Sequence, residues 1–296
     1  LEKSNVLALG RNAIYDKPFV CGFGAALPNL YFSAESVMVT SYAAQNNWIP
    51  IQYSYANEDY DTTVIDDAYT IYDNPVKKTL LPILASMYYS MKPFEQSGFE
   101  VSYEANDIIN MPIKEVYTKN MRVSFVNKDI QLNQQNQNIN VVKTQNIYWD
   151  AESGIFEART PNAEIMTGYF NVKEEMPSFI INTDNSYITA ALSSATGQTL
   201  QESNTLIFTV LCGNQNTGNN VNIVKNIFTN IGEAPILVQG ISGNVVLKLS
   251  GDYEIWALDS NGQRTAQIDT KKNSDGYIEF SVSPDYKAIQ YEIRRK

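Results

Sequence analysis

Histidine is absent from the 296 residues of this chain. Without imidazole there is no Ser-His-Asp or Cys-His nucleophile, no HExxH zinc site and no histidine proton shuttle, so carboxylate chemistry or binding remains. Cysteine is scarce: Cys21 and Cys212 lie far apart in apolar runs and form no CxxC pair. We expect two buried free thiols, the alternative being a disulfide that would link two domains.

Long apolar runs are also absent. No stretch reaches the ~18 consecutive apolar residues that a membrane-spanning helix needs, so no membrane span is predicted. The formal net charge is -10, with acidic residues spread along the chain, which disfavours a surface for nucleic acid or for an anionic membrane. The sequence contains no EF-hand loop, and we predict neither a metal site nor a cofactor.

The chain begins at Leu1 and lacks a signal-peptide pattern. We therefore expect a fragment, a processed chain or one subunit of a split protein. Asn, Gln, Thr and Tyr are abundant, and this composition is common in secreted surface proteins and in sugar-binding proteins. It favours a secreted or cell-surface location.

Residues 17–91 are the part of the chain with α/β character. Two short apolar runs, near residues 18–21 and 48–55, alternate with two helical patterns, and this alternation is typical of βα units in a parallel sheet. Pro75 opens the second helical pattern. Pro82 lies inside that pattern and predicts either a kink or a later start of the helix.

From residue 98 onward the apolar period becomes two. Many short strand candidates follow each other, separated by turns rich in Gly, Asn and Asp, which is typical of an antiparallel β-sandwich. The predicted fold is therefore α/β followed by β. We predict one domain over residues 1–97 and a β-sandwich region over residues 98–296, with a split near residue 175 if the sandwich is two domains.

The loop that follows the second predicted strand is the candidate ligand site. In parallel α/β folds ligands bind at the carboxyl ends of the strands, and this loop is rich in acidic and aromatic side chains. A solvated acidic loop is an equally weighted alternative. The candidate ligand-binding residues are Tyr53, Tyr55, Glu58, Asp59 and Asp61.

Several segments, in this order, carry a resemblance to a known family. They include a Lys17-Pro18-Phe19 strand, Trp48 on the next strand, Asp73-x-Pro75-Val76-Lys77 before a helix rich in Leu, then Ile147-x-Trp149-Asp150 and Asn214-x-Asn216-Thr217-Gly218. The chain resembles the C-terminal part of bacterial clan A glycoside hydrolases. The resemblance implies the last two βα units of a (β/α)8 barrel, followed by β-sandwich domains.

The family hydrolyses glycosidic bonds with two carboxylates. Its nucleophile is a glutamate at the end of the seventh barrel strand, and that position falls on Phe23 here. Phenylalanine cannot act as a nucleophile, and the strand that carries the acid/base residue is not in this sequence. We therefore assign no catalytic residue.

Two parallel strands cannot close a barrel. The resemblance thus predicts a partner, either an N-terminal region or a second polypeptide that completes the barrel; a decayed remnant packed on the sandwich is the alternative. For function we expect the C-terminal segment of a glycoside hydrolase-like protein that acts on or binds polysaccharide. The alternative is a non-catalytic carbohydrate-binding protein or a structural protein of surface assemblies.

Overall fold

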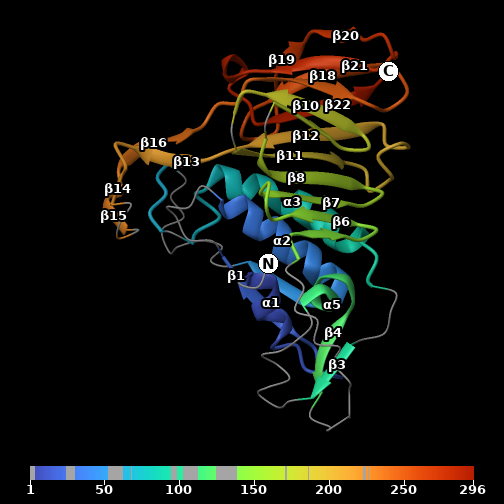
Figure 1. Cartoon of the computed structure of the whole chain (residues 1–296). Helices are drawn as coiled ribbons and strands as arrows, with labels where there is room; N and C mark the ends of the chain where they lie inside the picture. Colours follow the sequence, from blue (N-terminus) through green and yellow to red (C-terminus); the bar gives the residue numbers. More distant parts are fainter. Residues whose placement is uncertain are drawn as a thin grey trace.

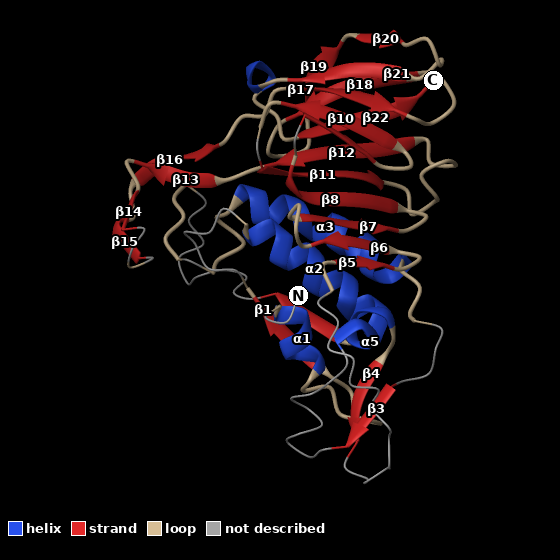
Figure 2. Ribbon diagram, viewed as in Figure 1, coloured by secondary structure: helices blue, strands red, loops and turns tan. Residues whose placement is uncertain are grey.

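The computed structural model describes residues 4–24, 31–52, 63–67, 69–94, 99–102, 113–124, 139–170, 172–185, 187–222, 225 and 227–296. Antiparallel β-sheet dominates these residues, accompanied by four α-helices (Figure 1). The helices gather in the N-terminal half, and the strands of the C-terminal half stack into large sheets (Figure 2). The prediction of a β-rich fold is confirmed, whereas the predicted domain boundaries remain predictions.

Small parallel sheets and helices form the N-terminal half. The strands are β1 (Val20–Phe23) paired with β2 (Ile49–Gln52), and β3 (Phe99–Ser102) paired with β4 (Met121–Ser124). The helices are α1 (Asn5–Gly10), α2 (Phe32–Asn46), α3 (Pro75–Ser90) and α5 (Ile113–Thr118). As the alternating pattern predicts, α2 connects two parallel strands. In the described ranges β1 and β2 pair only with each other, so no larger barrel wall is seen.

The first residues of α3 explain where the helix begins. Asn74 precedes it in an extended conformation, and its Oδ1 accepts the main-chain N–H of Lys77 at 2.9 Å. Pro75 occupies the first helical position, where a missing N–H costs nothing. The helix continues through Pro82 to its end, which excludes the later start.

A nine-stranded antiparallel sheet is the largest element, in the order β19-β18-β22-β12-β11-β8-β7-β6-β5. Its strands are β5 (Val141–Lys143), β6 (Ile147–Asp150), β7 (Ile155–Arg159), β8 (Ala163–Tyr169), β11 (Tyr187–Ser194), β12 (Thr205–Leu211), β18 (Tyr253–Leu258), β19 (Arg264–Ile268) and β22 (Gln290–Arg295). A five-stranded sheet packs against it, in the order β20-β21-β17-β10-β9. These strands are β9 (Val172–Glu175), β10 (Phe179–Thr183), β17 (Gly243–Leu247), β20 (Thr270–Lys272) and β21 (Ile278–Val282).

The helices and the five-stranded sheet cover opposite faces of the nine-stranded sheet. On one face α2 and α3 pack against β7, β8 and β11, and Tyr42 of α2 meets Trp149 of β6. On the other face Phe179 of the smaller sheet meets Phe208 of the larger one edge to face. Since successive side chains of a strand point to opposite faces, the same strands serve both cores.

The two covering layers are displaced along the sheet. Strand β8 contributes Ile165 to the helix-side core and Met166 to the core between the sheets. Strands β6 and β7 contribute only to the helix-side core, through residues such as Ile147 and Phe156. Their other face lies beyond β9, the edge strand of the smaller sheet, and carries polar side chains instead.

A long bent hairpin, which we call the arm, projects sideways from the sandwich (Figure 1). Its strands are β13 (Asn214–Thr217), β14 (Asn220–Asn222), β15 (Ile227–Asn230) and β16 (Glu233–Val238). The arm contacts the segment before α3 through Asn216, which hydrogen-bonds both main-chain groups of Ile65. A second contact joins Asn214 Nδ2 to Asn74 Oδ1 at 2.8 Å.

Two further expectations concern thiols and membranes. Cys21 and Cys212 are both free and buried, so the prediction of two buried thiols is confirmed and the interdomain disulfide is excluded. Within the described residues, no helix has the length and apolar character needed to cross a membrane.

Candidate functional site

The predicted sugar-binding loop cannot be placed. Tyr53, Tyr55, Glu58, Asp59 and Asp61 all lie outside the described residues, so their role remains a prediction. The strand that leads into this loop, β2, is described up to Gln52.

The structure places Phe23 at the end of β1, with its side chain only 6% exposed in the helix-side core. Cys21, two residues earlier, points to the same core. The side chain at this position therefore packs among apolar groups, and its role within the described residues is structural.

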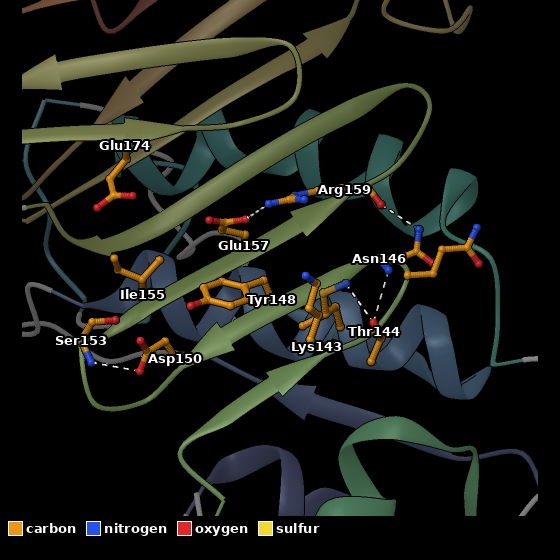
Figure 3. Close-up of a pocket in the computed structure, with 12 residues that line it drawn as sticks. Lys143, Thr144, Asn146, Tyr148, Asp150, Ser153, Ile155, Glu157, Arg159 and Glu174 are labelled. Carbon is orange, nitrogen blue, oxygen red and sulfur yellow. Dashed lines mark hydrogen bonds and ion pairs between the residues drawn. The ribbon is translucent and has the colours of Figure 1, made fainter.

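An open pocket of about 410 Å³ lies on the uncovered face of β5, β6 and β7 (Figure 3). Its size falls within the roughly 300–1,000 Å³ that small-molecule sites occupy. The side chains that give it chemical character are Lys143, Tyr148, Asp150, Glu157, Arg159 and Glu174. Glu174 comes from β9, so the edge of the smaller sheet forms one wall of the pocket.

Strand periodicity explains how these side chains come together. Tyr148 and Asp150 lie on one face of β6. Ile147 and Trp149 lie on the other face and are buried against the helices. In Figure 3 the ring of Tyr148 lies between Asp150 at one end of the pocket and Lys143 at the other.

An ion pair joins Glu157 to Arg159 on β7. The Glu157 side chain is 7% exposed and that of Arg159 is 38% exposed, so the guanidinium compensates a largely buried carboxylate. Asn146 Nδ2 donates to the main-chain oxygen of Arg159 at 2.8 Å, which holds the strand end in place. Arg159 Nε is buried and has no hydrogen-bond partner among the described residues.

The two ends of the pocket are fixed by local hydrogen bonds. At one end Asp150 Oδ1 accepts the main-chain N–H groups of Glu152 and Ser153 at 2.9 and 3.1 Å. Hydrogen bonds from Ser153 lower the pKa of Asp150, so this carboxylate stays charged at neutral pH. At the other end Thr144 Oγ1 accepts the N–H of Ile147 at 2.9 Å. The pocket is therefore built on rigid turns.

Glu174 differs electrostatically from the other pocket carboxylates. Burial raises its pKa, and the nearby charge of Glu157 raises it further. Pairing with Arg159 satisfies Glu157, whereas Glu174 prefers its neutral form more than an exposed glutamate does. The pocket thus presents both cationic hydrogen-bond donors and carboxyl groups in a small volume.

Sequence reasoning missed this pocket. Its signal is the polar half of two alternating segments, residues 147–150 and 155–159. An alternating strand normally has one solvated face, so the pattern alone does not separate a binding face from an ordinary exterior.

Neither a protein-family model nor a curated protein matches this chain.

A second cluster of ionisable groups lies where α3 begins. Lys77 is almost fully buried, with Nζ 5.9 Å from the centroid of the Phe32 ring. Burial lowers the pKa of Lys77 to about 8, although the charges of Asp73, Asp67 and Glu35 partly oppose this shift. Burial and the neighbouring Asp66 carboxyl raise the pKa of Asp73 to about 6.

The Lys77 shift predicts a pH-dependent stability difference. The unfolded chain protonates this lysine up to its ordinary pKa of 10.5, whereas the folded protein releases the proton at about 8. The cost of burying the charge is therefore complete below pH 8 and disappears as the pH rises to 10.5. We expect Lys77→Met to be more stable than the wild type at pH 7, with a gap that closes between these two values.

Urea unfolding of both proteins at a series of pH values measures that gap. Lys78→Met is the matched control, because Lys78 is the exposed neighbour on the same helix. A gap that stays constant from pH 7 to pH 10.5 would contradict the prediction.

Proposed function

We propose that this chain binds carbohydrate as the C-terminal segment of a glycoside hydrolase-like protein. The observation that supports this most strongly is the polar pocket on β5–β7, with Tyr148 at its centre. None of the described residues is assigned a catalytic role, since a phenylalanine occupies the position of the family's nucleophile. Catalysis in the complete protein would depend on residues outside this chain.

The chemistry of the pocket favours a neutral polyhydroxylated ligand. An anion or a cation would be opposed by part of the lining, because Asp150 and Glu157 carry one sign while Lys143 and Arg159 carry the other. Sugar hydroxyl groups both donate and accept, so they can satisfy carboxylates and cationic groups together. The ring of Tyr148 offers an apolar face for the C–H groups of a sugar.

Binding is tested with defined oligosaccharides on a glycan array and then by calorimetry. We expect measurable affinity for at least one class of glycan, and about a tenfold loss or more in Tyr148→Ala, roughly 1.4 kcal/mol. Tyr89→Ala is the control, since Tyr89 is 86% exposed on α3 and lies outside the pocket.

Hydrolysis assays on the same polysaccharides separate the functional alternatives. Binding without turnover supports a carbohydrate-binding role for this chain. The absence of both binding and hydrolysis with all of these polysaccharides would contradict the proposal and favour a structural protein of surface assemblies.

We also propose that further βα units, from an N-terminal region or a second polypeptide, cover β1 and β2. Parallel strands are normally buried on both faces, yet Val20, Ile49 and Ile51 are 51%, 48% and 50% exposed on the face away from the helices. Such a surface resembles an interior face of a βα barrel that lacks its other strands.

Size-exclusion chromatography with intact-mass analysis tests this completion. If the chain needs the missing units, it should associate or aggregate alone, and Ile51→Lys should reduce the aggregation. A wild-type chain that is folded, soluble and monomeric alone would contradict the proposal.

A further inference from the structure

Three tyrosines meet where the beginning of α2 approaches the ends of two strands. The ring centroids of Tyr31 and Tyr187 are 4.9 Å apart, those of Tyr169 and Tyr187 are 5.7 Å apart, and those of Tyr31 and Tyr169 are 5.8 Å apart. The hydroxyl groups of Tyr31 and Tyr169 are hydrogen-bonded to each other. We call Tyr31 and Tyr169 the tyrosine pair.

The third tyrosine, Tyr187, supports the tyrosine pair from the protein interior. Tyr187 is buried, and its hydroxyl group lies 3.3 Å from Ser33 Oγ and 3.2 Å from Thr167 Oγ1. Thr189 completes this network, with Oγ1 2.8 Å from both Ser33 Oγ and Thr167 Oγ1. Because the network joins α2 to the nine-stranded sheet, it makes a rigid base for the two outer rings.

The outer rings remain largely open to solvent. Tyr31 is 45% exposed and Tyr169 is 42% exposed. Tyr31 stands at the N-cap of α2 but its side chain makes no capping hydrogen bond, so helix formation does not explain where the ring lies. Rigid aromatic rings that stay exposed are a common feature of binding surfaces, since they contribute contact area at a small entropic cost.

The tyrosine pair lies near the Asp150–Gly154 turn on the helix side of the nine-stranded sheet, whereas the pocket opens on the opposite face. A Cβ placed on Gly154 would come within 3.0 Å of Tyr169 Cδ2, which shows that the ring lies directly against this glycine. Gly154 follows Ser153, a pocket-lining residue, in the same turn. The turn that connects β6 to β7 therefore lies between the polar pocket on one face of the sheet and the exposed rings on the other.

We propose that the tyrosine pair is a stacking site for a further sugar unit of the oligosaccharide whose other end occupies the pocket. This inference rests on the proposed carbohydrate binding and extends it to a longer ligand that passes around the Asp150–Gly154 turn from one face of the sheet to the other. Sugar rings pack their C–H faces on tyrosine, and the hydroxyl groups of the pair lie where they can bond sugar hydroxyls. The site then selects for chain length.

The experiment is a calorimetric series with cello-, xylo-, manno- and laminari-oligosaccharides, from disaccharides to octasaccharides. In the wild type we expect affinity to rise with length until both sites are occupied. Tyr31→Ala and Tyr169→Ala should each weaken binding of the longest ligand about tenfold, in line with the loss of one aromatic contact. Disaccharide binding in the pocket should not change.

Further variants separate stacking from folding. Tyr31→Leu keeps apolar bulk beside Tyr187 but removes the aromatic face, so it should lose the same affinity if stacking matters. Tyr31→Phe keeps the ring and should retain most of it. Tyr89→Ala serves as the surface control, and thermal unfolding verifies that each variant is folded.

Three outcomes decide the matter. Loss of affinity for long ligands alone in Tyr31→Leu and Tyr169→Ala supports the inference. Unchanged binding at every length in these variants, with weakened binding in Tyr148→Ala, overturns the tyrosine site and leaves the proposed function intact. A wild type that binds none of the saccharides overturns both.

Discussion

Gly168→Ala is expected to lower the free energy of unfolding by roughly 3–5 kcal/mol, among the largest effects of single substitutions. Gly168 has a φ of 147°, and a Cβ there would lie 2.1 Å from the main-chain oxygen of Gly154. That oxygen belongs to the neighbouring strand end, where it accepts the N–H of Tyr169 at 3.3 Å. A methyl group can be accommodated only if β7 and β8 separate.

The measurement is thermal unfolding, where we expect the midpoint to fall by roughly 6–20 °C, given about 2–4 °C per kcal/mol for a large domain. Gly197→Ala is the matched control: its φ of 76° is also unfavourable for alanine, but no atom lies within 4 Å of the added Cβ. The control should lose about 1 kcal/mol from backbone strain alone. Equal losses in the two variants would show that the close approach of the strands is not the cause.

Asn216→Ala is expected to cost roughly 2–4 kcal/mol, because it leaves several main-chain groups without a partner. The side chain is 2% exposed and makes three hydrogen bonds. Its Oδ1 accepts from Ile65 N at 2.8 Å, and its Nδ2 donates to Ile65 O at 2.8 Å and to Ile231 O at 2.9 Å. Since Ile65 is itself buried, solvent replaces these bonds poorly.

Local consequences distinguish this variant from a general loss of stability. The bonds of Asn216 hold the arm to the segment before α3, so hydrogen exchange should accelerate there and in β13 and β16 more than in β11 or β12. Asn220→Ala is the control, because this exposed asparagine lies on the same arm and its side chain is not part of the contact. Uniformly faster exchange in every strand would contradict the assigned role.

The sequence pattern predicted individual helices and strands well where interactions between neighbouring residues determine them. The capping oxygen of Asn74 and the fixed φ of Pro75 are sufficient to begin α3, and both are visible in the sequence. The parallel β1-α2-β2 unit also follows from short-range pattern. The loop of Tyr53 and Asp61 was predicted as a ligand site from its place after a parallel strand and from its acidic and aromatic side chains, and it lies outside the described residues.

The candidate site depended on long-range arrangement. Alternation in β6 determines that Tyr148 and Asp150 share one face and that Trp149 takes the other. Which of the two faces is covered depends on where the helices and the smaller sheet come to rest. Glu174 joins the pocket from a different sheet, and no local rule predicts that contact.

By itself, the sequence determined the chemistry available to this protein: no imidazole, two separated thiols, a net charge of -10 and many polar side chains. It also determined most strand and helix positions, because side-chain period and capping act over a few residues. Only the tertiary structure decided that α2 and the smaller sheet cover displaced regions of the nine-stranded sheet. That displacement leaves the polar face of β5–β7 open and brings Tyr31 against Tyr169, 138 residues away, since packing acts between segments that are distant in the chain.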